Sequence, residues 1–354
     1  MKDIIVSEAE TGIRLDKFLE KLLPHAGRSF LYKMLRKKNI ILNEKKADGS
    51  ERLRAGDHIR IFFSDETYEQ FRCGNGLKAA GAVKTFKQPS VCVIYEDSEM
   101  LIADKPAGLL TQRAEKTDNS LNDWLCAYVR TQTDEVTKEA VRLNYTPSAV
   151  NRLDRNTSGL VLCAKTYPAA RELSSLIHDR RIKKYYLAVV MGQISAPRVL
   201  DGFLVKDNIN NRVTVVKDGT GEEIHTAYTP LFYLERHDLT LILVQLITGK
   251  PHQIRAHLMD SGHPVCGDPK YGNAGLNRVL SNKYGIHRQL LHAFALTFPE
   301  TTTRGERSPS PLAGKTVIAP PPQDFKKLLQ SYPIGDFIWQ RGIQEDFAVP
   351  PLRI

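Results

Sequence analysis

The segment from Val150 to Lys165 contains the residues best suited to chemistry. Its sequence, VNRLDRNTSGLVLCAK, places Asp154 between Arg152 and Arg155, directly before a short apolar run. Such a run is typical of a buried strand, so we expect the aspartate in the loop before it. A carboxylate that nearby positive charges keep ionised can act as a nucleophile or a general base. An ordinary surface ion pair fits the same pattern, and the spacing alone leaves both interpretations open.

A second candidate group is a set of histidines late in the chain, which raises the alternative of a metal hydrolase. The set is His252, His257, His263 and His292. His252 and His257 are five residues apart, which turns them to different helix faces, whereas a helical zinc pair prefers a spacing of four. The five cysteines contain no C-x-x-C pair, which argues against a cysteine zinc site and a secreted disulfide framework. The pattern therefore disfavours a metal site.

The elements that must position these residues begin at about residue 91, where short strands alternate with a few helices. We expect strands at 91–97, 100–106, 159–164, 185–190, 213–216, 227–234 and 239–247. We expect helices after residue 165 and at 252–261, the second ending at Gly262. Blocks of strands with helices between them indicate an α+β domain at 91–300, with a mixed, mainly antiparallel sheet. Residues 301–354 are predicted to be a loosely packed tail with a short helix at 325–329.

The first 63 residues are predicted to be a separate small α+β unit. Two amphipathic helices are expected at 14–23 and 29–37, followed by strands at 40–42 and 59–63. The polar, glycine-containing stretch 64–90 is predicted to be a linker.

The second of these helices carries an unbalanced group of positive charges. The group is Arg28, Lys33, Arg36, Lys37 and Lys38, with no acidic residue between them. Most charge runs are solvated faces, but five like charges on a short helix repel each other unless a polyanion relieves them. The whole chain carries a formal net charge of +10, which suits RNA, DNA or an anionic membrane. We predict that the helix binds phosphates.

Membrane insertion and secretion are not expected. The most apolar stretch, 239–247, is too short to cross a bilayer, and the start MKDIIVSEAE lacks the apolar core of a signal peptide. With the scattered cysteines, these features predict a cytoplasmic protein.

The segment RLDRNTSGL at 152–160 resembles the catalytic motif of the RluA family of pseudouridine synthases. The resemblance implies that Asp154 is the catalytic residue and that Arg152 enters the RNA to replace the extruded uridine. It also implies a pseudouridine synthase fold. The family usually has histidine before that arginine, whereas this chain has Asn151.

Further blocks resemble the family in the expected order. ADKPAGL at 103–109 resembles the first motif, whose Lys105-Pro106 pair would form the floor of the site, with Lys105 at the RNA. IKKYYLA at 182–188 resembles the block with the active-site tyrosine, here Tyr186 rather than Tyr185. GKPHQIRAHL at 249–258 resembles the motif whose arginine, here Arg255, pairs with the catalytic aspartate.

The resemblance also implies the partners. The first 63 residues resemble the αL RNA-binding module, through RLDKFL at 14–19, the basic helix and LRAGDHIRI at 53–61. Isomerising a uridine transfers no electron or group out of the system, so no cofactor or metal is expected. We predict a monomer that acts on structured RNA, with no DNA partner. Large-subunit ribosomal RNA is the favoured target. Transfer RNA, or a non-catalytic role in ribosome assembly, is the alternative.

Overall fold

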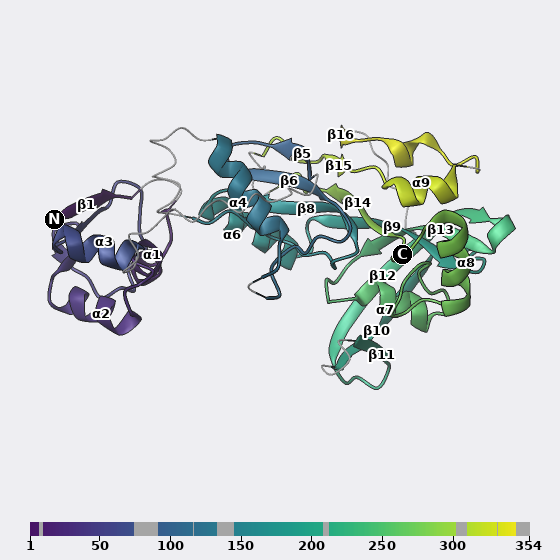
Figure 1. Cartoon of the computed structure of the whole chain (residues 1–354), viewed down its shortest axis with the longest axis horizontal. Coiled ribbons are helices and arrows are strands. Elements are labelled where there is room, and N and C mark those ends of the chain that lie inside the picture. Colours follow the sequence, from purple (N-terminus) through teal and green to yellow (C-terminus); the bar gives the residue numbers. More distant parts are fainter. Residues whose placement is uncertain are drawn as a thin grey trace.

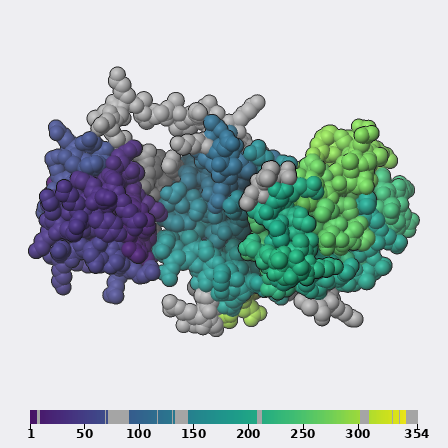
Figure 2. All heavy atoms as spheres, turned by 90° about the horizontal axis from the view of Figure 1, so that it is seen from below, coloured from purple at the N-terminus to yellow at the C-terminus, as the bar shows by residue number. Residues whose placement is uncertain are grey.

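The computed structural model describes residues 1–6, 10–73, 91–115, 117–132, 145–207, 212–301, 310–330 and 332–344. The predicted-linker residues 74–90 and the tail residues 302–309 and 345–354 lie outside them. The chain forms a small amino-terminal part and a larger part built on one extended sheet (Figure 1). In Figure 2 the amino-terminal part is a separate purple lobe beside the larger one. The two parts touch where the Lys21 ammonium lies 5.5 Å from the centre of the Tyr145 ring.

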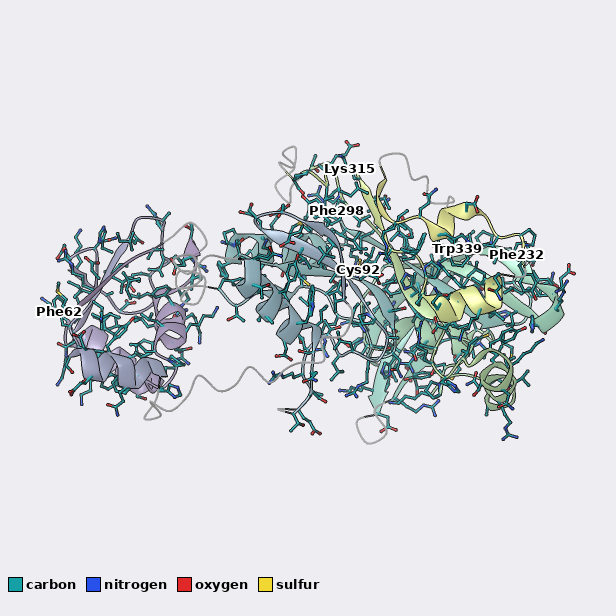
Figure 3. All side chains as sticks on the ribbon, turned by 45° about the horizontal axis from the view of Figure 1, so that its top comes forward. Phe62, Cys92, Phe232, Phe298, Lys315 and Trp339 are labelled. Atoms are coloured by element: carbon teal, nitrogen blue, oxygen red, sulfur yellow. The ribbon has the colours of Figure 1, made fainter. Side chains whose placement is uncertain are left out.

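The amino-terminal part combines three helices with a four-stranded antiparallel sheet in the order β1-β4-β2-β3. Its elements are β1 (Lys2–Ile5), α1 (Leu15–Leu22), α2 (Arg28–Arg36), β2 (Ile40–Leu42), β3 (Lys45–Lys46), β4 (His58–Ile61) and α3 (Asp65–Cys73). Both predicted helices are present, and their apolar stripes, including Phe18 and Leu31, are buried. Phe62 remains on the outer surface, 46% exposed (Figure 3).

The helix α3 was not predicted and begins inside the stretch assigned to the linker. It packs because Phe71 inserts beside Phe30 and Phe63, with ring centroids 4.6 and 6.2 Å away. The described residues up to Cys73 therefore continue the first folded part. Aromatic residues 8 and 41 positions before Phe71 supply this contact, which a local composition rule does not register.

The larger part is a twelve-stranded sheet whose main path runs β11-β10-β12-β13-β9-β14-β8-β6-β5. Its strands are β5 (Cys92–Glu96), β6 (Met100–Lys105), β7 (Ser148–Ala149), β8 (Ser158–Ala164), β9 (Lys183–Met191), β10 (Arg198–Asp207), β11 (Arg212–Val216), β12 (Glu222–Leu234), β13 (Leu239–Leu246), β14 (Leu291–Thr297), β15 (Thr316–Ile318) and β16 (Gly342–Gln344). The β14–β8 pair is parallel and the other pairs are antiparallel. The predicted mixed, mainly antiparallel sheet of an α+β fold is confirmed.

Helices cover both faces of this sheet. They are α4 (Leu121–Gln132), α6 (Tyr167–His178), α7 (Gln253–Asp260), α8 (Ala274–Tyr284) and α9 (Gln323–Leu329). Apolar residues of α4 and α7 share one core cluster with Tyr186. Those of α8 and α9 pack on the opposite face with Tyr185, because neighbouring side chains on a strand point to opposite faces. No helix among these described residues is long and apolar enough to cross a membrane.

The carboxyl-terminal segment is packed, so the expectation of a loose tail is wrong for residues 310–330. Strand β15 pairs with β14 and extends the sheet beyond residue 300. The predicted short helix is present as α9, and it buries Phe325, Leu328 and Leu329. Farther along, Trp339 packs in the same cluster as Phe232 (Figure 3). The polar composition of the segment hid these few apolar anchors.

Candidate active site

Asp154 lies in the loop between β7 and β8, as its position before an apolar run predicts. The loop turns tightly, since the Thr157 N–H donates to the Asp154 carbonyl at 3.0 Å. Strand β8 then passes against β14, and Gly159 makes the approach feasible. A Cβ there would lie 2.2 Å from the Ala293 carbonyl oxygen, and its φ of +113° favours glycine. This glycine fixes the strand that carries the aspartate loop.

Lys105 supports the loop from beneath and does not reach its surface. The side chain is fully buried at the end of β6. Its ammonium donates to the carbonyls of Leu109 (2.7 Å), Pro106 (3.0 Å) and Arg155 (3.2 Å). Burial, aided by the charge of Arg288, lowers the pKa of Lys105 to about 7. In this structure the ammonium does not reach the surface, and the predicted contact of Lys105 with RNA stays a prediction. Its contacts make it an internal support for the residue after Asp154.

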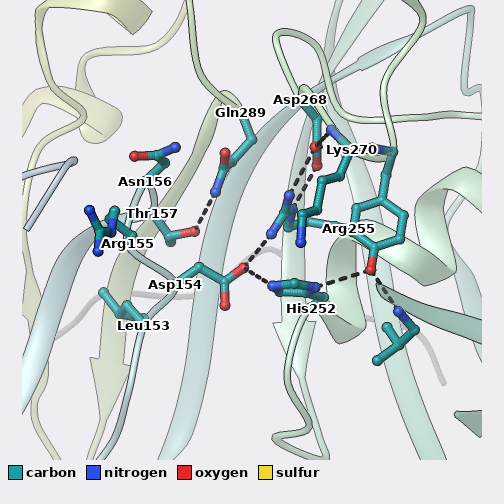
Figure 4. A network of polar contacts seen from close by, with 12 residues as sticks. Leu153, Asp154, Arg155, Asn156, Thr157, His252, Arg255, Asp268, Lys270 and Gln289 are labelled. Atoms are coloured by element: carbon teal, nitrogen blue, oxygen red, sulfur yellow. Dashed lines mark hydrogen bonds and ion pairs between the residues drawn. The ribbon is translucent and has the colours of Figure 1, made fainter. Parts of the chain in front are cut away.

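Arg255 joins two carboxylates that are far apart in the sequence. From α7, its Nη1 donates to Asp154 Oδ2 at 2.8 Å, and its Nε and Nη2 clamp Asp268 at 2.6 and 2.9 Å (Figure 4). Burial opposes its charge, but the two carboxylates outweigh burial and raise the pKa of Arg255. Burial likewise opposes the charge of Asp268, yet Arg255 holds the pKa of that carboxyl below its usual value. The predicted pairing of Arg255 with Asp154 is present.

The two oxygens of Asp154 have different surroundings. Oδ2 accepts from Arg255, while Oδ1 accepts no hydrogen bond from any described residue. The side chain is 25% exposed, compared with 0% for Asp268. Asp268 is thus a buried counter-charge, whereas Asp154 is partly exposed and has one oxygen without a described hydrogen-bond partner.

Asp154 also lines a small pocket. Its volume is about 50 Å³, room for only one or two water molecules. Apolar side chains of Leu246, Ile254 and Leu291 form part of its lining. Arg152 also lines it, is exposed, and forms no ion pair within the described ranges. The pocket must widen before it can enclose a nucleobase.

Tyr186 lines the same pocket from β9 and is almost completely buried. Burial, with the Asp154 charge adding to it, raises the pKa of its phenol. The hydroxyl forms no hydrogen bond with the part of the chain that the structure describes. Tyr185 points to the other face, so of the two neighbouring tyrosines the structure places Tyr186 at Asp154.

His252 is a neighbour of Asp154 that the sequence did not single out for this site. Its Nε2 lies 4.0 Å from Asp154 Oδ2, and its Nδ1 lies 3.0 Å from the Tyr271 hydroxyl. Burial lowers its pKa. The segment GKPHQIRAHL pointed to Arg255 alone, because the approach of His252 and Tyr271 depends on how α7 meets the loop at 266–272.

The basic residues of α2 lie outside this pocket, in the amino-terminal part (Figure 1). Arg28 is engaged there, 3.3 Å from Glu20 and 3.8 Å from Asp16. The other predicted phosphate-binding residues are exposed and form no ion pair with described residues: Lys33, Arg36, Lys37 and Lys38. The structure therefore offers two separate basic sites, one at Arg152 and one on α2.

The late histidines make separate contacts. His257 Nδ1 lies 2.8 Å from Thr226 Oγ1, His263 Nδ1 lies 2.9 Å from the Met191 carbonyl, and His292 lies between Ser158 and Ala319. Across the described ranges, no three or more histidine, cysteine or acidic side chains form a group that could hold a metal ion.

Comparisons with known proteins agree on one family. A family model described as RNA pseudouridylate synthase matches residues 99–260. An uncharacterized RNA pseudouridine synthase of Mycoplasma genitalium is 33% identical over 85% of this chain and 90% of its own length. The ribosomal large subunit pseudouridine synthase D of Nitrosomonas europaea is 28% identical over 93% of this chain and 87% of its own.

One solved structure supports the fold. Human RNA pseudouridylate synthase domain containing 4 matches with a TM-score of 0.51 and 20% identity, over 67% of this chain and 91% of that one. At that identity the match concerns the architecture of the sheet and its helices.

Proposed function

The chain belongs to the RluA family of RNA pseudouridine synthases, and we propose that Asp154 is its catalytic carboxylate and large-subunit ribosomal RNA its substrate. The observation that carries the first part is the asymmetry of Asp154. Arg255 holds Oδ2 at 2.8 Å, whereas Oδ1 has no described hydrogen-bond partner, and the side chain lines the pocket. A charge-assisted bond on one oxygen fixes the carboxylate and leaves the other to react.

The reaction depends more on holding the detached uracil in the site than on a cofactor. It breaks the bond between ribose C1′ and uracil N1, turns the base, and joins C1′ to C5, with a proton lost at C5 and one gained at N1. Asp154 would assist cleavage of the first bond. The apolar lining, with Leu246 and Leu291, would hold the freed uracil while it turns.

Tyr186 and Arg152 have complementary roles in this proposal. The raised pKa of Tyr186 makes its phenol a poor general base at neutral pH and favours packing against the uracil. Arg152 would enter the RNA stack as the uridine leaves it, which its exposed position at the pocket supports. Extruding a base from a duplex costs a few kcal/mol, and an inserted side chain offsets part of that cost.

The choice of substrate rests on the amino-terminal part and on relatives. The exposed cations of α2 suit the phosphates of structured RNA, which give affinity without reading the sequence. The Nitrosomonas relative, named for the ribosomal large subunit, aligns with 93% of this chain. Transfer RNA is the second candidate, because single-stranded loops of either RNA could present an unstacked uridine.

Pseudouridine mapping tests both parts of the proposal. Ribosomal and transfer RNA from cells that lack the gene would be compared with RNA from cells complemented with wild type or Asp154→Asn. We expect specific pseudouridines in large-subunit RNA to disappear and only the wild type to restore them. If pseudouridines disappeared from transfer RNA alone, the proposal that large-subunit ribosomal RNA is the substrate would be refuted. Restoration by Asp154→Asn would refute the role of the carboxylate.

A further inference from the structure

His252 occupies an unusual backbone position next to Asp154. It is the residue from which α7 starts, and its φ of +56° and ψ of 9° lie in the left-handed region. Non-glycine residues rarely adopt this conformation, because it is sterically strained. The conformation places the imidazole between Asp154 and Tyr271. Figure 4 shows the ring directed at Asp154, beside Arg255.

The direction of the hydrogen bonds around His252 follows from its neighbours. The Val213 backbone N–H can only donate, and it donates to the Tyr271 hydroxyl oxygen at 2.9 Å. Burial raises the pKa of Tyr271, so the phenol keeps its proton and has that proton left to donate to His252 Nδ1, 3.0 Å away. A neutral histidine that accepts at Nδ1 carries its own proton on Nε2. Nε2 is the atom that faces Asp154.

The charges that face the imidazole come from four residues. Burial lowers the pKa of His252, and Arg255 and Lys270 act in the same direction, whereas Asp154 and Asp268 oppose them. The lowered pKa keeps the ring neutral at pH 7. A neutral donor can orient a carboxylate without placing a second full positive charge beside Arg255, which would reduce the reactivity of Asp154.

We propose that His252, held by Tyr271, is a positioning residue. When RNA fills the pocket, its Nε2–H donates a hydrogen bond to Asp154 Oδ2. Together with Arg255 it then occupies both acceptor positions of Oδ2, so that Oδ1 alone faces the uridine. The present separation of 4.0 Å exceeds a hydrogen bond. Contacts in an unliganded active site commonly tighten when the substrate binds. The proposal rests on the assignment of Asp154 as the catalytic carboxylate.

Two substitutions separate hydrogen bonding from packing. His252→Phe keeps a ring against Tyr271, which now lies edge-on with ring centroids 5.6 Å apart, but removes the donor. His252→Gln returns an amide N–H near the place of Nε2. His58→Gln, at a 47% exposed histidine of the amino-terminal part, is the matched control. Thermal unfolding and RNA binding show whether each variant is folded.

The readout is the single-turnover rate of pseudouridine formation at saturating RNA, with the RNA dissociation constant measured beside it. We expect His252→Phe to slow the step about 10–100-fold, the usual effect of losing an orienting partner, with RNA binding unchanged. His252→Gln should be slowed much less. The proposal would be overturned if the single-turnover rate fell equally in both variants, or if RNA binding weakened while the rate stayed unchanged.

The pH profile provides a second readout. The step needs neutral His252, so its rate falls as the pH drops through the pKa of that ring. In Tyr271→Phe the neutral ring loses the bond at Nδ1, so its pKa rises and the acidic fall moves to higher pH. If the rate of His252→Phe still falls at the same acidic pH as the wild-type rate, another group titrates.

Asp154→Asn in the same assay separates the two claims. If wild type is active, Asp154→Asn is inactive and His252→Phe is as fast as wild type, only the role of His252 fails. If Asp154→Asn is as fast as wild type, the proposed carboxylate itself is wrong.

Discussion

Replacing Arg255 with methionine removes the cation that links the two carboxylates. Asp268 would remain completely buried without its counter-charge, whereas Asp154 could be solvated because it is 25% exposed. Breaking a buried ion pair by removing one partner costs about 3–5 kcal/mol. Asp268 keeps the backbone N–H groups of Lys270 at 2.8 Å and Tyr271 at 3.1 Å. We therefore expect the lower end, a loss of about 3 kcal/mol in the free energy of unfolding.

Urea denaturation followed by tryptophan fluorescence measures this loss. The two tryptophans of the chain are Trp124 and Trp339, both in the larger part, so their signal reports on that part alone. The double variant Arg255→Met/Asp268→Asn is the control, because it also removes the stranded charge. It should recover much of the lost stability while remaining inactive. A single variant destabilised by less than about 1 kcal/mol, or a double variant less stable than the single one, would refute the account of Asp268 as a buried counter-charge.

Three further predictions concern other sites. Burial lowers the pKa of His292 to about 4, so stability that is full above pH 6.5 should decline as the pH falls toward 4. The free energy of unfolding, measured by urea titration at each pH, should fall less steeply with pH in His292→Gln than in wild type. An unchanged dependence on pH would assign the decline to another group. Lys105→Met should slow pseudouridine formation without weakening RNA binding, measured by single turnover and filter binding. A selective loss of binding would instead support direct RNA contact. Neutralising the exposed cations at α2 should weaken RNA binding. The slope of log binding constant against log salt concentration should become shallower by up to about 0.9 per lost phosphate contact. The rate of pseudouridine formation at saturating RNA should not change. A lowered saturated rate would contradict the separation of the two basic sites. These cations are Lys33 and Arg36 in α2 and Lys37 and Lys38 directly after it.

The sequence predicted the ion pair between Asp154 and Arg255, although 101 residues separate them. That prediction came from the resemblance of two motifs to a family, because spacing alone cannot bring such distant residues together. The mixed sheet followed from the alternation of strands and helices. Strands β10 and β14 and helices α4 and α8 were missed, since their apolar residues acquire a buried side only after the sheet has formed.

In two places the sequence did not predict burial, for a common physical reason. Lys105 was predicted to contact the RNA because its motif resembles the one that forms the floor of the family's site, and a motif does not show whether the ammonium is exposed. Its burial depends on three carbonyls that the loops at 106–109 and 155 bring to one point. Residues 310–330 were expected to be loose because the segment after about residue 300 is rich in Thr, Arg, Ser and Pro. The side of β14 that pairs with β15 and the apolar core beneath α9 exist only in the folded chain.

The most direct test of the central claim is the single-turnover rate of purified Asp154→Asn on the RNA identified by mapping. Asparagine keeps the size of the side chain and removes the negative charge that Arg255 holds. Asp218→Asn, at an exposed aspartate, controls for loss of a carboxylate in general. The account predicts no detectable pseudouridine from Asp154→Asn, with RNA binding intact and Asp218→Asn as fast as wild type. Pseudouridine formation by Asp154→Asn at the wild-type rate would contradict it.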